Sequence, residues 1–465
     1  MAPGNYQPVW VALGCGSSLV GSPGRGFSSA PRGAKDGTAL AAPTSKNCTV
    51  KLFTVDPTMH SRPTQAVILA GGRGTRLAPL TDTLPKALIP FHGKPFLGQV
   101  VDMLREQGFE RVLLLLGYMA DAMIDHFGDG SAYGVEISYR VTDADDLTAY
   151  RVKEAADQLD ERFLLLYCDN YWPMQFDRMW RAYMDSGAPA QITVYANADG
   201  YTRDSVIVGE DGFVTVFDRG RTTPGLSGVE ISYAILEKAA VLPLLPEHQE
   251  LFEEAVYPAL TARGELHAYW SEHRYYSVGG HERLPLTEAF FARSPTIILD
   301  RDGVLNVRPP RAEYVCKPEE LRWLPGAREA LAAFNRAGWR VLVVSNQPGV
   351  ARGRMTLDDL ASVHRRLCGE AEAAGGRIDR IYFCPHGWDE GCACRKPAPG
   401  MLFQAQRDHH LDLTRTTFLG DDERDGQAAD AAGCPFGLVT ESEPLLAHAE
   451  RLLGLHAAGR TAVAG

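Results

Sequence analysis

Two separate series of short apolar runs, each alternating with stretches of helical periodicity, constrain the fold of this chain more than any other feature. The first series has its runs at 66–70, 111–117, 135–140 and 162–169, with amphipathic helices expected at 96–107 and 149–159. The second has its runs at 296–300, 339–346, 380–385 and 416–422, with helices expected at 326–337 and 357–373. Strands that alternate with helices form parallel sheets covered on both faces. The sequence therefore predicts an α/β protein with two doubly wound domains.

The predicted domains occupy 64–290 and 295–446, with the boundary in a short segment that ends at Pro295. Residues 1–63 are rich in Gly, Ala, Ser and Pro and are expected to form a disordered leader. Met59 stands just ahead of the first strong strand and is an alternative start of translation. Residues 447–465 are expected to be a C-terminal tail.

Composition excludes several classes of partner. The 465-residue chain carries a net charge of -11, which disfavours nucleic acid and anionic membranes. Its mildly apolar run near the N-terminus is too short to span a bilayer. Nine cysteines, six of them widely scattered, are unlike the dense framework of a small secreted domain. We expect a cytoplasmic protein that acts on small molecules, with its oligomeric state left open.

The first chemical signal is the string "LAGGRGTRLAPLTDTLPKALIP", which starts at Leu69. A strand ends there in a glycine-rich turn, where backbone N–H groups can surround phosphate oxygens, and basic side chains follow. This pattern predicts a triphosphate-binding site. The expected binding residues are Gly71, Gly72, Arg73, Gly74, Thr75, Arg76 and Lys86.

The whole string resembles the signature of the sugar-1-phosphate nucleotidyltransferases, over roughly 65–290. The resemblance implies a Rossmann-like domain in which Arg76 and Lys86 hold the triphosphate and act in catalysis, while Asp169 binds Mg²⁺. Asp169 could instead simply cap the turn after its strand. Two positions depart from the family: Ser277 stands where a second metal-binding Asp is usual, and Leu147 where a Gly is usual.

The second signal is "ILDRDGVLN", in which an apolar strand ends at Asp300 and a second carboxylate, Asp302, follows. Two acidic residues after a strand could be turn formers, but the string resembles the first motif of the haloacid-dehalogenase-like phosphatases. That resemblance implies that Asp300 is the nucleophile and Asp302 the acid and base. It also implies phosphoryl binding by Ser345 and Asn346, a cationic Lys396, and Mg²⁺ held by Asp300, Asp302 and Asp421.

The segment "FCPHGWDEGCACRKPAPG" places three cysteines and a histidine in one loop. Three thiolates and one imidazole form the closed tetrahedral set of a structural zinc site. A redox site would favour Cys-x-x-Cys at the start of a helix, whereas both pairs here are spaced by one residue. The expected Zn²⁺ ligands are Cys384, His386, Cys392 and Cys394. Fixing this loop would also fix Arg395 and Lys396, which follow it.

The zinc loop, together with "DRDGVLN", "NQPGVARG" and "CRKPAPGM", is similar to the D-glycero-D-manno-heptose 1,7-bisphosphate phosphatases. The resemblance makes Arg352 and Arg395 substrate-binding candidates. It implies a bifunctional enzyme of nucleotide-activated heptose synthesis, because the phosphatase product, heptose 1-phosphate, suits the N-terminal domain, with GTP the favoured nucleotide. The alternatives are a phosphatase with a degenerate nucleotidyltransferase-like binding module, or a phosphatase for histidinol phosphate or another sugar phosphate.

Overall fold

The computed structural model describes residues 62–461, with side chains up to residue 454. The predicted leader lies outside the described residues, apart from its last two. Within residues 62–461, no helix is apolar and long enough to traverse a lipid bilayer.

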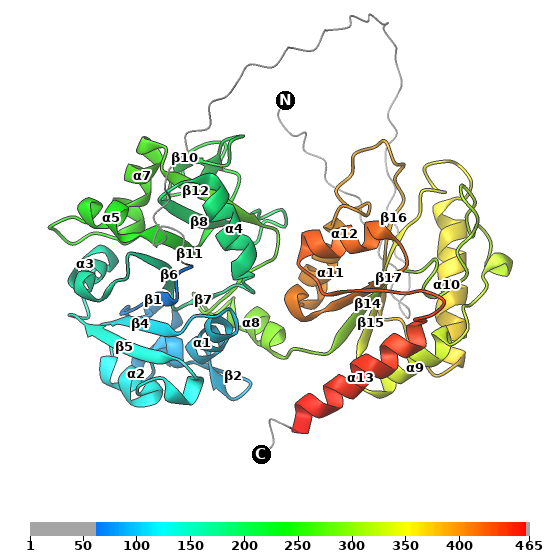
Figure 1. Ribbon diagram of the computed structural model, residues 1–465, viewed down its shortest axis with the longest axis horizontal. Helices are drawn as coiled ribbons and strands as arrows, with labels where there is room; N and C mark the ends of the chain where they lie inside the picture. Colours follow the sequence, from blue (N-terminus) through cyan, green and yellow to red (C-terminus); the bar gives the residue numbers. More distant parts are fainter. Residues whose placement is uncertain (1–61, 462–465) are drawn as a thin grey trace, which may run out of the picture. The chain divides into compact units, whose positions relative to one another are not determined.

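The N-terminal domain contains a seven-stranded sheet (Figure 1). Its strand order is β12 (Leu266–Ser271), β8 (Ala190–Tyr195), β11 (Val229–Glu237), β6 (Arg162–Tyr167), β1 (Gln65–Ala70), β4 (Arg111–Leu116) and β5 (Glu136–Val141). Strands β1, β4, β5 and β6 pair in parallel, as predicted. Strand β11, which the sequence analysis did not assign, runs antiparallel to both β6 and β8, so the complete sheet is mixed.

Alternate residues of β1 point to opposite faces of this sheet, and each face has its own hydrophobic core. Ala66 and Ile68 pack with one set of helices, and Val67 and Leu69 with another. The first set is α1 (Phe96–Glu106), α2 (Ala120–Phe127), α4 (Phe176–Ser186) and α8 (Leu284–Phe291). The second set is α3 (Thr148–Glu154), α6 (Phe252–Ala255) and α7 (Tyr257–Arg263). The helix predicted over 149–159 is shorter, because α3 ends at Glu154 and a separate 3-10 turn follows at Ala156–Gln158.

The C-terminal domain contains a five-stranded, wholly parallel sheet. Its order is β16 (Arg380–Cys384), β15 (Arg340–Asn346), β14 (Thr296–Leu299), β17 (Thr417–Gly420) and β18 (Phe436–Leu438). Helices α9 (Ala327–Arg336), α10 (Leu357–Ala373) and α13 (Leu445–Thr461) cover one face, and α11 (Gly400–His409) and α12 (Glu423–Ala432) cover the other (Figure 1). The fold is therefore the α/β class that the sequence predicted, in two doubly wound domains.

The structure differs from the C-terminal tail that we predicted from residue 447. Helix α13 begins at Leu445, and Ala449 is fully buried in the core that it forms with α9. The proposed boundary at 446 therefore falls inside a helix whose apolar residues complete the domain.

Short elements complete the fold. The two-stranded ribbons are β2 (Pro90–Phe91) with β3 (Lys94–Pro95), β7 (Asn170–Tyr171) with β13 (Tyr276–Ser277), and β9 (Val206–Val208) with β10 (Val214–Phe217). A short helix, α5 (Lys238–Val241), follows β11. The ribbon of β7 and β13 matters most for function, because it brings Ser277 beside the segment that follows Asp169.

Candidate active sites

The carboxyl ends of the parallel strands in the C-terminal domain place the predicted phosphatase residues around one cavity. Asp300 directly follows β14, Ser345 lies near the end of β15, and Asp421 directly follows β17. Such ends meet at one edge of a parallel sheet, where α/β proteins bind ligands. Asp300 and Ser345 line a cavity of about 750 Å³, and the Lys396 side chain reaches it from the cysteine-bearing loop.

Lys396 is the buried cation of this cavity, with 3% of its surface exposed. Its Nζ lies 2.8 Å from an oxygen of Asp300 and 2.7 Å from an oxygen of Asp425. Its backbone is fixed by Asn346, whose side-chain amide donates to the Lys396 carbonyl at 2.9 Å and accepts from its N–H at 3.1 Å. Asn346 therefore holds the lysine in place, and it also lines the cavity in which we predicted that it binds substrate.

Asp425 is a site residue that the sequence analysis did not place among the metal ligands. It lies in the first turn of α12, one helical turn after Asp421, and is 2% exposed. Carboxylate oxygens of Asp300, Asp421 and Asp425 lie within 4.8 Å of one another. The run of acidic residues from Asp421 into the first turn of α12 was the available signal.

Burial and mutual repulsion perturb these carboxylates. Burial raises the pKa of Asp300 to about 7, with Lys396 opposing the shift and Asp425 adding to it. Burial likewise raises the pKa of Asp421 to about 6, against the pull of Arg308. One oxygen of Asp421 is buried with no hydrogen-bond partner among the described residues. Three crowded carboxylates and an unpaired oxygen fit a hard divalent cation.

Gly303 makes room for this cluster. Its φ is +95°, and a Cβ atom there would lie 1.8 Å from an oxygen of Asp421. Both the backbone conformation and the contact exclude a side chain. The glycine of "DRDG" is thus required by the approach of Asp421 to the loop after Asp300.

The carboxylate of Asp302, which we also predicted as a metal ligand, lies outside the group formed by the other three. It accepts hydrogen bonds from Asn306 at 2.8 Å, from Gln347 at 2.9 Å and from the guanidinium of Arg301 at 2.9 to 3.1 Å. Burial opposes its charge, but Arg301 and these donors hold its pKa below the usual value. Asp302 therefore lines the same cavity with its oxygens turned toward a buried set of donors.

Arginines form the outer wall of this cavity. Arg352 donates to the hydroxyl of Tyr314 at 2.6 Å, and Arg395 approaches the His386 carbonyl at 3.4 Å. Arg308 bridges Asp421 and Asp422 at 3.2 and 2.6 Å. The predicted substrate-binding arginines thus line the cavity that contains Asp300, and they give its wall a positive charge.

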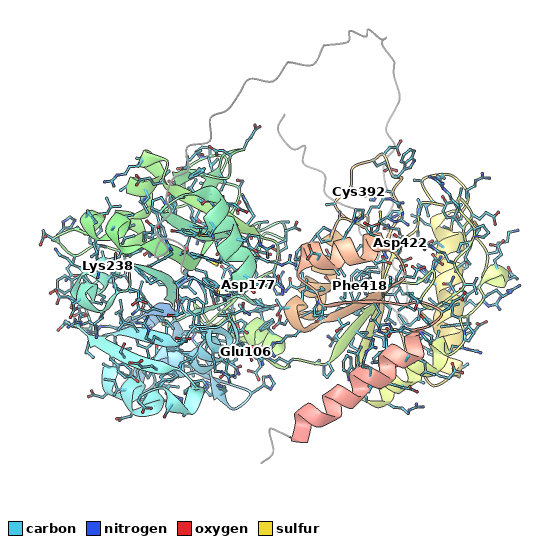
Figure 2. The ribbon with its side chains drawn as sticks, in the orientation of Figure 1. Glu106, Asp177, Lys238, Cys392, Phe418 and Asp422 are labelled. Atoms are coloured by element: carbon cyan, nitrogen blue, oxygen red, sulfur yellow. The ribbon has the colours of Figure 1, made fainter. Side chains whose placement is uncertain are left out.

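The structure brings together the four predicted zinc-binding residues, of which Cys392 is labelled in Figure 2. The Sγ atom of Cys392 lies 3.6 Å from that of Cys384 and 3.5 Å from that of Cys394. Nδ1 of His386 lies 3.5 Å from Cys384 and 3.2 Å from Cys394. Zn–S bonds of about 2.3 Å imply tetrahedral edges of roughly 3.5 to 3.8 Å. Hydrogen bonding with Cys394 lowers the pKa of Cys384 to about 5, and the same contact raises the pKa of Cys394.

In the N-terminal domain, the glycine-rich turn follows β1 and leads into a 3-10 turn at Thr75–Leu77. Gly74 has a φ of +67°, which favours glycine. Arg73 forms an exposed ion pair with Asp145 at 2.8 Å and lies over the ring of Tyr118. Its guanidinium is therefore already paired at the edge of the predicted triphosphate site. A triphosphate that binds Arg73 would have to replace Asp145 as its partner.

Lys86 and Asp169 form a partly buried ion pair at 2.7 Å. Burial disfavours the charge of Asp169, but Lys86 and Arg76 outweigh it and lower its pKa. The N–H of Val278 donates to the Asp169 carbonyl at 2.9 Å, which places Ser277 beside this pair. The structure thus brings together Lys86, Asp169 and Ser277, the last of which differs from the residue usual in the family.

Arg151 is a second residue that the sequence reasoning missed. It is 2% exposed and donates to the carbonyls of Leu116 and Asp143 at 2.6 and 2.9 Å. A Cβ atom on Gly71 would lie 2.3 Å from its Cζ. The first glycine of the turn is therefore required by the approach of a buried guanidinium, which ties β4 and the loop after β5 to this turn. Leu147 precedes α3, and its N–H donates to Gln249 at 2.7 Å.

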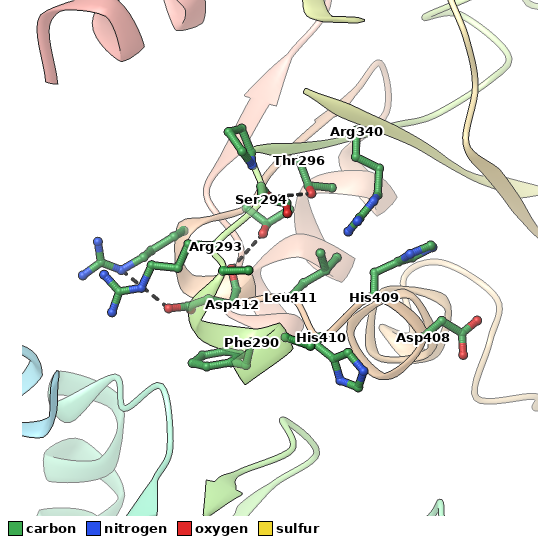
Figure 3. Close-up of a pocket in the computed structure, with 15 residues that line it drawn as sticks. Phe290, Arg293, Ser294, Thr296, Arg340, Asp408, His409, His410, Leu411 and Asp412 are labelled. Carbon is green, nitrogen blue, oxygen red and sulfur yellow. Dashed lines mark hydrogen bonds and ion pairs between the residues drawn. The ribbon is translucent and has the colours of Figure 1, made fainter. Parts of the chain in front are cut away.

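A different cavity, of about 370 Å³, lies around the start of β14 (Figure 3). It is lined by residues 292–296 and 408–412, among others. Neither group of metal-ligating side chains found in the described residues contributes to it. We therefore place no chemistry there.

Comparison with known families gives two matches, one toward each end of the chain. Residues 65–204 match the family model described as nucleotidyl transferase, and residues 393–452 match a HAD-hydrolase-like family. The first match contains the glycine-rich turn, Lys86 and Asp169, and the second contains Lys396, Asp421 and Asp425.

Two relatives share the name D-glycero-beta-D-manno-heptose-1,7-bisphosphate 7-phosphatase. The protein from Rhodopseudomonas palustris is 40% identical over 160 residues, which are 33% of this chain and 87% of that protein. The protein from Bordetella bronchiseptica is 43% identical over 143 residues, 31% of this chain and 79% of that protein. Among solved structures, HddC from Yersinia pseudotuberculosis is 24% identical and covers 49% of this chain and 99% of its own, with a TM-score of 0.43. A likeness at that TM-score carries no argument about substrate.

Proposed function

This chain belongs to the family of the D-glycero-beta-D-manno-heptose-1,7-bisphosphate 7-phosphatases, and we propose that it is a bifunctional enzyme of nucleotide-activated heptose synthesis. The C-terminal domain removes one phosphate from heptose 1,7-bisphosphate. The N-terminal domain transfers a nucleotidyl group, with GTP as the favoured donor, to the heptose 1-phosphate that remains. Adjacent steps on one chain explain why a phosphatase is joined to a nucleotidyltransferase domain.

The observation that carries the phosphatase proposal is the convergence of Asp300, Ser345 and Lys396 on one cavity, with Asp421 beside it. Acidic residues that served only to form turns would not be expected to converge on one buried lysine. The arginine wall at Arg352 and Arg395 supports a substrate with a second phosphate, because guanidinium groups bind phosphate in a bidentate manner.

In the proposed reaction, an oxygen of Asp300 attacks the phosphorus atom, and the bond from phosphorus to the sugar oxygen breaks. Asp302 enters the step in its protonated form, against the donors that favour its ionised form in the free site, and gives this proton to the departing sugar oxygen. It then takes a proton from the water that attacks the aspartyl phosphate, which releases inorganic phosphate and restores Asp300. Lys396 supports the first step, because Asp300 must be ionised to attack, and the lysine opposes the burial that raises the pKa of Asp300 to about 7.

We propose two metals. Mg²⁺, bound by Asp300 and Asp421, would neutralise negative charge on the phosphoryl group. Zn²⁺, bound by Cys384, His386, Cys392 and Cys394, would fix the loop that precedes Arg395 and Lys396.

For the N-terminal domain, Arg76 and Lys86 would bind the triphosphate, and Asp169 would bind Mg²⁺. One observation favours the alternative of a nucleotidyltransferase-like binding module. Lys86 neutralises Asp169 at 2.7 Å, and Ser277 offers only a hydroxyl where a second carboxylate would strengthen metal binding. Pyrophosphate release separates the two possibilities, since an enzyme produces it and a binding module does not.

Two matched variants test the division of labour. Asp300→Asn should lower phosphate release from heptose 1,7-bisphosphate by about 10³-fold or more, and nucleotidyl transfer to supplied heptose 1-phosphate should stay near wild type. Asp169→Asn should give the converse result, with pyrophosphate formation lost and phosphate release retained. Colorimetric phosphate assays, with and without added pyrophosphatase, measure both activities.

A loss of both activities in either variant would contradict separate sites. Wild-type protein that releases phosphate but forms no pyrophosphate would leave only the binding module for the N-terminal domain.

A further inference from the structure

Gln347 lies directly behind the phosphatase cavity and has no role in the reaction described above. It follows β15, is 1% exposed, and its N–H donates to the Cys384 carbonyl at 2.7 Å. Its Nε2 donates to Ser345 Oγ at 2.9 Å and to Asp302 Oδ2 at 2.9 Å. One buried amide thus contacts both the predicted phosphate-binding hydroxyl and the acid and base.

Arg301 determines which way this amide points. The guanidinium is fully buried and donates to the Gln347 oxygen at 3.1 Å. An arginine has no acceptor, so the amide oxygen must face it and both amide hydrogens must face Ser345 and Asp302. The guanidinium is itself held by Asp302 and by Nε2 of His364 at 3.2 Å.

This arrangement makes Ser345 the acceptor in its hydrogen bond with Gln347. The Ser345 oxygen accepts from Gln347, so its own hydrogen is free to donate in another direction. Ser345 lines the cavity, where a phosphoryl oxygen would be the acceptor. The same amide holds one oxygen of Asp302, and Asn306 holds the other at 2.8 Å. A shift of Ser345 on phosphate binding would therefore change the hydrogen bond to Asp302 through a shared donor.

We propose that Gln347 is a positioning residue that couples phosphoryl binding at Ser345 to the orientation of Asp302, with Arg301 fixing the amide. The proposal rests on the proposed phosphatase activity of this site. It predicts that Gln347 acts in the chemical step rather than in substrate affinity, because it touches the two groups and not the cavity.

A double-mutant cycle with Ser345→Ala, Gln347→Leu and the double variant tests this coupling. Gln347→Leu should lower kcat about 10- to 100-fold, the range of a misplaced acid and base, with KM changed less than about threefold. In the Ser345→Ala background the same change should cost clearly less, because part of its effect passes through the serine hydroxyl. A purely structural role would give equal costs in both backgrounds and would overturn the proposal.

Gln347→Glu provides the matched variant, and it serves alone if Gln347→Leu does not fold. It keeps the size of the side chain but replaces the donor with an acceptor beside Asp302. It should be at least as slow as Gln347→Leu, and near wild-type kcat would overturn the proposal.

Each variant is measured with heptose 1,7-bisphosphate and with p-nitrophenyl phosphate. If the protein hydrolyses p-nitrophenyl phosphate but not heptose 1,7-bisphosphate, and the coupling is seen with p-nitrophenyl phosphate, the proposed substrate is wrong and this inference still holds. Wild-type protein that hydrolyses neither compound would remove both.

Discussion

Replacement of Lys396 by methionine should destabilise the C-terminal domain in a pH-dependent manner. The methionine keeps the apolar stem but removes the cation that contacts Asp300 at 2.8 Å and Asp425 at 2.7 Å. All three side chains are at most 10% exposed, so water cannot replace the lost charge. Breaking a buried ion pair on one side costs about 3 to 5 kcal/mol.

The sign of the pH dependence follows from Asp300. Its pKa is raised to about 7 in the folded protein, against about 3.9 in an unfolded chain. The stability linked to this group is therefore complete below about pH 4 and is lost as the pH rises through about 7. Without Lys396 the carboxyl binds its proton even more tightly. The variant should thus lose most stability at pH 8 and much less at pH 5.

Scanning calorimetry in buffer without added magnesium measures the effect. A cost of about 3 to 5 kcal/mol lowers the melting temperature of a domain this size by roughly 6 to 20 °C at pH 8. Lys153→Met provides the control, because Lys153 pairs with Glu247 at the surface and its removal should hardly change the melting temperature. An equal loss at pH 5 and pH 8, or no loss, would refute the reasoning.

Two further predictions concern the metals. Purified protein should contain about one zinc per chain, and Cys392→Ser should lower both the zinc content and the phosphatase rate, whereas Cys316→Ser, outside the loop, should change neither. Elemental analysis checks this, and fully active protein without zinc would contradict it. Ser277→Asp should lower the Mg²⁺ concentration needed for half-maximal pyrophosphate formation if Asp169 lacks a second carboxylate partner. A magnesium titration that is unchanged or worse would show that another group completes that site.

The parallel pairing in the C-terminal domain was predictable from the alternation of apolar strands and helices along its sequence. Apolar strands alternating with helices require parallel pairing, and this places residues after β14 and β17 at the same edge of the sheet. The structure shows Asp300 and Asp421 there. Asp425 was not predicted, because an acidic residue in the first turn of a helix is equally expected as a favourable partner of the helix dipole.

Other features depend on contacts that a sequence pattern does not record. Strand β11 runs antiparallel to both of its neighbours, and the composition of a strand does not record its direction, so this pairing could not be recognised from the sequence. The direction of the Asp302 carboxylate depends on Gln347, which is 45 residues away. Arg151 lies on a half-polar helix and gave no sign that it reaches Gly71. Buried polar contacts between distant segments are set by the tertiary fold.

Phosphorus NMR of the purified full chain with heptose 1,7-bisphosphate, Mg²⁺ and each nucleoside triphosphate in turn tests the bifunctional assignment most directly. We expect inorganic phosphate to appear first. Heptose 1-phosphate should then be consumed while pyrophosphate and the paired resonances of a nucleoside diphosphate sugar grow, most rapidly with GTP. Phosphate without pyrophosphate for every nucleotide would contradict the transferase assignment, and an unchanged bisphosphate would contradict the phosphatase assignment.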